Sequence, residues 1–114
     1  MNIYVSTYSN KKILYKCEIK KNGIINIEKR IKMNDYVSYM SRFNSKIAIA
    51  LKKSSEENKA GIALLNKNLK CEYEYKNDNS YTHIYINKKY IIAGSYHNSN
   101  ILIINRKNKK SNLV

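Results

Sequence analysis

Short segments in which apolar and polar residues alternate recur along the whole chain. They cover residues 3–8, 12–19, 24–31, 36–41, 46–52, 60–65, 69–75, 81–86, 90–96 and 101–105. A period of two, with β-branched and aromatic residues enriched, is typical of strands with one face in a core. Asn, Ser, Lys and Gly fill the links, and Asn22-Gly23 favours a tight hairpin turn. Because the links are short, we expect antiparallel pairing of successive strands and no long helix.

One of these strands repeats at a constant spacing. Residues 90–96 (YIIAGSY) align with residues 46–52 (KIAIALK) and with residues 2–8 (NIYVSTY), at successive offsets of 44 positions. The preceding strand, residues 81–85, aligns with residues 37–41 at the same offset of 44. A repeat of about 40–50 residues built from four strands is typical of a β-propeller blade. The sequence therefore predicts an all-β chain, a β-propeller fragment.

The expected strands divide the chain into one full blade between two partial blades. The full blade covers residues 36–75, the partial blades cover residues 2–31 and 80–106, and residues 107–114 form a polar tail or the start of a turn into a fourth strand. A closed propeller needs about four or more blades, so this length predicts part of one, with one modest core. Unpaired strand edges are expected to favour self-association.

The charge of the chain is strongly positive. Lys and Arg outnumber Asp and Glu by 22 to 8, which gives a net charge of +14. Such an excess favours an anionic partner, and nucleic acid is one alternative. However, Lys, Asn, Ile and Tyr are all encoded by A/T-rich codons, and the lysines are scattered rather than aligned with stacking aromatics. We therefore prefer codon bias as the explanation, regard nucleic-acid binding as unlikely, and note that a small anionic substrate would still be favoured.

The remaining composition narrows the environment of the protein. Cys17 and Cys71 lie on different expected strands without a metal-binding spacing, so we interpret them as free thiols. No metal and no cofactor are expected. The N-terminus lacks the cationic and apolar regions of a signal peptide, and no apolar run approaches the roughly 20 residues of a membrane span. The expectation is a cytoplasmic chain that does not bind a membrane.

Three motifs resemble one protein family. The segment Tyr81-Thr82-His83-Ile84, residues 90–96 and residues 98–103 (NSNILI) resemble the seven-bladed β-propeller lactonases that hydrolyse 6-phosphogluconolactone. Residues 2–8 and 39–50 are similar to the family's opening strand and first full blade. The resemblance covers nearly all of the chain but about a third of a family member. It implies a fragment of a lactonase of the pentose phosphate pathway, inactive alone, that acts on a small anionic sugar lactone.

The sequence also departs from the family pattern. The Pro-Asp-Gly turns that the family places between the first two strands of a blade are absent, and residues 43–45 (FNS) and 87–89 (NKK) stand there. Lys52-Lys53 occupies the place where many members carry Asn-Glu. A role for an acidic residue at that position is therefore not expected here.

Lactone hydrolysis defines the chemistry that a site would need. Water must be activated by a base, the developing oxyanion needs a donor, and the substrate phosphate needs cations. His83 is the candidate base, because imidazole titrates near neutrality, and Tyr96 is the candidate oxyanion donor. Arg42, Lys52 and His97 are candidates for substrate binding. Each has a structural alternative: a hydrogen-bonded strand histidine, a tyrosine packed between blades, or a solvated loop residue. The other function left open is a non-catalytic propeller module that binds a ligand or a protein.

Overall fold

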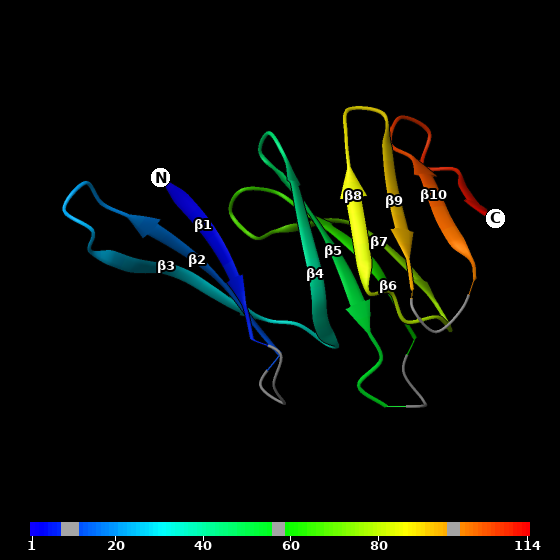
Figure 1. Cartoon of the computed structure of the whole chain (residues 1–114), viewed down its shortest axis with the longest axis horizontal. Helices are drawn as coiled ribbons and strands as arrows, with labels where there is room; N and C mark the ends of the chain where they lie inside the picture. The colour runs from blue at the N-terminus through cyan, green and yellow to red at the C-terminus, as the bar shows by residue number, and fades with distance from the viewer. Residues whose placement is uncertain (8–11, 56–58, 96–98) are drawn as a thin grey trace.

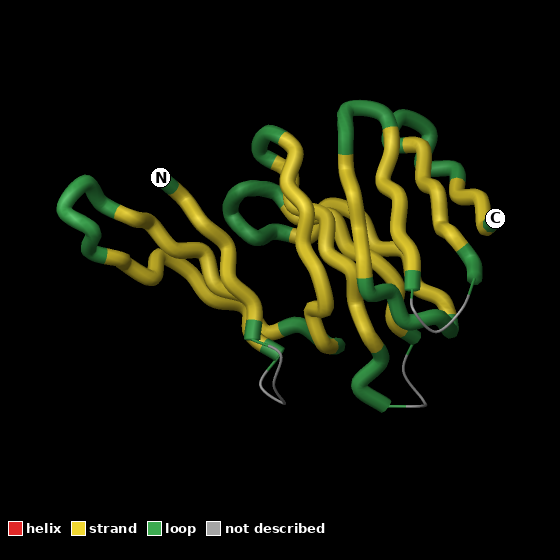
Figure 2. Tube along the Cα trace, in the orientation of Figure 1, coloured by secondary structure: helices red, strands yellow, loops and turns green. Residues whose placement is uncertain are grey.

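The structure, a computed structural model, is a stack of antiparallel sheets. It describes residues 1–7, 12–55, 59–95 and 99–114. Within these ranges the chain forms three antiparallel sheets and no helix, as Figures 1 and 2 show. The prediction of an all-β chain built from consecutive antiparallel meanders is confirmed.

Each sheet is a meander in which every strand pairs with the next one along the chain. The first sheet contains β1 (Asn2–Ser6), β2 (Ile13–Ile19) and β3 (Ile25–Lys32). The middle sheet contains β4 (Tyr36–Phe43), β5 (Lys46–Lys52), β6 (Ala60–Leu65) and β7 (Cys71–Asn77). The last sheet contains β8 (His83–Ile86), β9 (Tyr90–Gly94), β10 (Ile101–Asn105) and β11 (Ser111–Leu113).

We expected residues 107–114 to form a polar tail or the start of a turn into a fourth strand, and the structure contains the turn and the strand. Residues 106–110 connect β10 to β11 through a turn at residues 106–108, and β11 pairs with β10, so a short fourth strand completes the last sheet within the described residues. Asn105 stabilises this turn, because its side-chain Oδ1 accepts hydrogen bonds from the backbone N–H groups of Lys107 (2.9 Å) and Asn108 (3.3 Å). Such local side-chain bonds let Asn begin a turn that hydrophobic patterning does not reveal.

The middle sheet carries the core on both of its faces. In β5, Ile47 and Ile49 belong to a buried cluster with Leu14 of the first sheet. Ala48 and Ala50, which alternate with them, belong to a second cluster with residues of the last sheet such as Ile91. Burial on both faces explains why β5 is a nearly continuous apolar run instead of an alternating one. The middle sheet therefore lies between the other two.

Polar contacts fix the first sheet against the middle sheet. The Tyr4 hydroxyl donates to the backbone carbonyl of Lys67 at 3.0 Å, and Lys29 Nζ donates to the carbonyl of Asn68 at 2.8 Å. Both acceptors lie in the turn between β6 and β7. These bonds orient the first sheet against the middle sheet. The first sheet's main apolar contribution to the cluster that the two sheets share is Leu14, which is fully buried.

The middle and last sheets meet along β4 and β8, which lie side by side and run in the same direction (Figure 1). Tyr81, just before β8, joins them. Its backbone N–H donates to the carbonyl of Leu51 at 2.9 Å, and its own carbonyl accepts a hydrogen bond from the Ser38 hydroxyl. We expected Tyr81 in a strand, but β8 begins only at His83, because Tyr81 forms its hydrogen bonds with the middle sheet.

Candidate functional site

One end of the stack gathers polar side chains from three segments. There β5 and β9 end and β8 begins. Two hydrogen bonds hold the segments together: Lys53 N–H donates to the side-chain Oγ of Ser80 at 2.9 Å, and Thr82 N–H donates to the carbonyl of Gly94 at 2.9 Å. We call this region the His83 end, after the one histidine within the described residues.

His83 is exposed and lies at the start of β8. Its Nδ1 is 3.2 Å from the hydroxyl of Thr82, and its ring centroid is 5.5 Å from that of Tyr39 on β4, with the planes tilted by 40°. These contacts give the imidazole an orienting hydrogen-bond partner and an aromatic wall.

A shallow hollow of about 330 Å³ lies beside the imidazole. Besides His83, the lining consists of Tyr39 of β4 and of residues of the last sheet that are mostly apolar or aromatic: Ile84, Tyr85, Ile92, Ala93, Gly94 and Ile101. An apolar and aromatic lining with a few polar groups is typical of a small-molecule site, where the polar groups fix the orientation of the ligand.

The segment that follows β5 is anchored by a buried carboxylate. Asp35 is only 3% exposed, and its Oδ1 accepts hydrogen bonds from the Ser54 N–H at 3.1 Å and the Ser54 hydroxyl at 3.0 Å. This anchor fixes the path of Lys52 and Lys53 at the His83 end. Our sequence reasoning did not include Asp35; its place in the polar Asn34-Asp35 link before β4 was the available signal.

Arg42 lies elsewhere. Its Nε donates to the carbonyl of Asn44 at 3.0 Å, its Nη1 to the carbonyl of Asn2 at 3.4 Å, and its guanidinium lies 5.6 Å from the centroid of the Tyr4 ring. It lines a hollow between the first and middle sheets that His83 does not share. The structure therefore brings Lys52 to the same end as His83 but not Arg42. Tyr96 and His97 lie outside the described residues.

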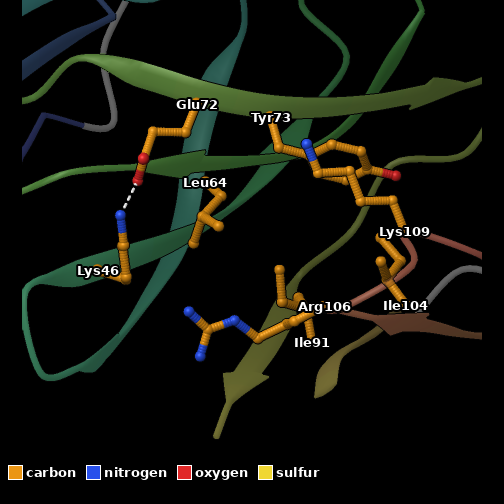
Figure 3. Close-up of a pocket in the computed structure, with 8 residues that line it drawn as sticks. All are labelled: Lys46, Leu64, Glu72, Tyr73, Ile91, Ile104, Arg106 and Lys109. Carbon is orange, nitrogen blue, oxygen red and sulfur yellow. Dashed lines mark hydrogen bonds and ion pairs between the residues drawn. The ribbon is translucent and has the colours of Figure 1, made fainter. Parts of the chain in front are cut away.

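A second hollow, of about 200 Å³, lies between the middle and last sheets. Figure 3 shows its lining, Lys46, Leu64, Glu72, Tyr73, Ile91, Ile104, Arg106 and Lys109. Its cations have partners within the chain. Lys46 forms an ion pair with Glu72, Arg106 Nη1 donates to the carbonyl of Asn87 at 2.7 Å, and Lys109 Nζ lies 5.6 Å from the Tyr73 ring centroid. The contact between Lys109 and Tyr73 links the last sheet to the middle sheet, and the other two contacts lie within one sheet each, so the hollow is better explained as a structural seam.

Within the described residues, the thiols and acids do not form a metal centre. Residues 1–7, 12–55, 59–95 and 99–114 contain no cluster of three or more His, Cys, Asp or Glu that could hold a metal ion. Cys17 is buried and Cys71 is exposed, and both are free. Partial burial, and then the nearby carboxylate of Glu74, raises the pKa of Cys71 above its ordinary value. At neutral pH, Cys71 therefore has less of the reactive thiolate form than an ordinary cysteine.

Neither the models of protein families nor the curated proteins include a match to this chain. In the described part of the chain, no helix is long and apolar enough to cross a lipid bilayer.

Proposed function

We propose that the three sheets are blades of a lactonase-type β-propeller and that the His83 end contributes to a site for a small anionic sugar lactone, 6-phosphogluconolactone. The arrangement of the sheets supports the blade hypothesis. Positions related by the offset of 44 residues, Ile49 and Ala93, both point from their own sheet toward the preceding one. The neighbouring strands β4 and β8 are the first strands of their sheets, as expected of inner strands around a propeller axis.

The observation that carries the functional proposal is the position of His83. It lies at the end of an inner strand, beside an apolar hollow, with Thr82 to orient its ring. In the proposed mechanism, Nδ1–H donates to the Thr82 hydroxyl, and the lone pair on Nε2 accepts a proton from the water that attacks the lactone carbonyl. The ammonium of Lys52, on the same end, would attract the substrate phosphate. We exclude Arg42 from this set because it contacts Asn2 and Tyr4 instead.

Binding and turnover are separable in this proposal. Three sheets leave a propeller channel incomplete, so we propose that the 114-residue chain alone binds the sugar phosphate without hydrolysing the lactone. Calorimetric titration with 6-phosphogluconate, the product of lactone opening, tests the binding. We expect Lys52→Met to raise the Kd about tenfold or more. Arg42→Met is the matched control, since it removes a cation from the other hollow, and should leave the Kd unchanged. Absence of binding at millimolar ligand would refute the proposal.

The catalytic role needs a longer protein that carries these residues within a complete propeller. There, His83→Ala should lower turnover of 6-phosphogluconolactone by about 2–4 kcal/mol of barrier if His83 acts as base. The measurement is steady-state hydrolysis, corrected for spontaneous opening of the lactone, with folding checked by circular dichroism. Wild-type rates in a folded His83→Ala protein would assign His83 a structural role.

A second candidate function is a non-catalytic propeller module that binds a ligand or a protein. The exposure of His83 and the apolar lining of its hollow favour this alternative, because together they offer a contact surface. Binding of 6-phosphogluconate without hydrolysis in the complete propeller would support it.

Nucleic-acid binding remains the least favoured interpretation. Several aromatic rings that could stack on bases are already covered by cations of the chain itself, with 5.6–5.8 Å between the cation and the ring centroid. The pairs are Lys12 with Tyr36, Arg42 with Tyr4, Arg106 with Phe43 and Lys109 with Tyr73. Salt-sensitive binding of single-stranded DNA, measured by fluorescence anisotropy, would argue for this function.

A further inference from the structure

Every sheet of the chain uses its two faces in a fixed order. Residues separated by 44 positions in β1, β5 and β9 have corresponding orientations. Tyr4 packs toward the middle sheet, and Ala48, 44 residues later, packs toward the last sheet. These two residues point to the following sheet, on what we call the forward face. Ile49 packs toward the first sheet and Ala93 toward the middle sheet, so they point to the preceding sheet, on the backward face.

This rule leaves one apolar face at each end of the stack. The backward face of the first sheet has no preceding sheet in the described structure, yet it carries large apolar side chains. Val5 is 44% exposed, Ile25 58% and Ile27 64%. In the strand pairing, Val5 lies beside Tyr15, and Cys17 lies between Ile3 and Ile27. All five side chains are on this face.

The forward face of the last sheet is apolar in the same way. Tyr85 is 56% exposed and Ile101 45%. In the strand pairing, Ile92 lies beside Tyr85, and Ile103 lies beside Ile92. By the offset of 44 residues, Ile92 corresponds to Ala48, whose position is covered by the following sheet. Contiguous exposed apolar surface of this kind marks an interaction site.

We propose that these two faces bind each other between two copies of the chain, with the forward face of one last sheet packed on the backward face of another first sheet. The contact repeats the relation between successive sheets that the chain already forms twice: first with middle, and middle with last. A second copy of the chain therefore carries the face that is complementary to each of the two exposed faces. Because the two faces differ, the contact is heterologous, and it continues into a ring or a filament.

The edges of the sheets are less suited to association. The outer strand β3 carries Glu28, Lys29, Arg30 and Lys32, and charged side chains on an edge oppose pairing with another strand. The outer strand β11 has only three residues, Ser111–Leu113, and short edge strands offer few unpaired groups. This contrast favours the faces over these two outer edges as the site of the contact.

Two single substitutions separate the faces. Ile27→Lys places a charge on the backward face of the first sheet, and Ile101→Lys places one on the forward face of the last sheet. Both residues are exposed, so folding is expected to persist, as circular dichroism can check. Ile24→Lys is the matched control, because Ile24 is 55% exposed just before β3 and outside both faces. Val5→Lys and Tyr85→Lys serve as replacements if either variant fails to fold.

The experiment is sedimentation velocity over concentrations of about 1 μM to about 1 mM, which span weak to moderate affinities. The wild type and Ile24→Lys should form species larger than a monomer. Ile27→Lys and Ile101→Lys should each be monomeric, with the Kd raised about tenfold or more. Their mixture should give a 1:1 dimer and nothing larger, since each copy retains the face that the other has lost. A monomeric wild type would overturn the proposal. Association that persists in both variants would also overturn it, because a contact between strand edges would persist in this way.

Discussion

Gly61 gives the sharpest test of the middle sheet. It lies in β6 with a φ of +142°, a conformation that residues with a side chain rarely adopt. A Cβ atom at this position would lie 1.8 Å from the backbone carbonyl oxygen of Tyr75, in the paired strand β7. Because the contacted atom belongs to the main chain, Gly61→Ala requires the two strands to separate locally. The substitution therefore affects a sheet buried on both faces.

The expected cost combines two effects. A non-glycine residue held in such a conformation costs about 1–3 kcal/mol, and displacement of the paired strand adds a similar amount, so we expect about 3–5 kcal/mol for Gly61→Ala. Small domains have a total stability of about 5–15 kcal/mol, so the loss is large. Urea unfolding followed by circular dichroism measures it. Gly94→Ala is the matched control, because its Cβ would meet nothing within 4 Å and its φ is not positive; its stability should change by less than about 1 kcal/mol. Equal midpoints for Gly61→Ala and the wild type would refute the reasoning.

Three further outcomes are expected. Leu14→Ala should lower the free energy of unfolding by about 2–5 kcal/mol in urea titration, because this fully buried side chain joins the first and middle sheets, and an unchanged midpoint would contradict the packing. Tyr81→Phe should cost about 1–2 kcal/mol in the same assay, since the Tyr81 hydroxyl accepts a hydrogen bond from Asn77 Nδ2 at 2.8 Å. The raised pKa of Cys71 means less thiolate at pH 8 than in an ordinary cysteine, and Glu74→Gln should lower that pKa and speed alkylation by iodoacetamide; an unchanged rate would contradict this.

The strands could be predicted because short apolar or alternating runs are separated by polar links along the chain. β5, β6 and β10 begin and end at the residues that the pattern indicated. The offset of 44 residues also held information about packing, since Ile49 and Ala93 occupy corresponding faces of successive sheets. Alternation and repeat spacing act through backbone geometry, which fixes the direction of each side chain within a strand. Neither signal specifies whether stacked sheets close into a propeller.

The pattern of hydrophobic residues could not predict the final strand, β11. Its residues, Ser111–Leu113, are all exposed, so no buried face leaves a periodic signal in the sequence. β11 instead depends on backbone pairing with β10 and on the turn that Asn105 stabilises. Lys109, directly after this turn, has a φ of 59°, which alternation also does not reveal.

Strand direction decides which of the candidate site residues lie at the same end of the sheets. His83 begins β8, whereas Arg42 is next to the last residue of β4. Because β4 and β8 run in the same direction, these residues lie toward opposite ends of the strands (Figure 1). Lys52 ends β5, which is antiparallel to β4, and so it lies at the end where β8 begins. The spacing of residues in sequence carries no information on which strand ends meet in space.

Tyr81 connects the fold to the candidate site. It is fully buried, although it lies only two residues before the exposed His83. Its N–H and carbonyl groups bond to Leu51 and Ser38 of the middle sheet, so the start of β8 is positioned against β4 and not only against β9. Buried polar groups that exchange hydrogen bonds in this way restrict a strand to one register, since any slip would leave them unpaired. The distance between His83 and Tyr39, and therefore the shape of the hollow beside them, follows from this register.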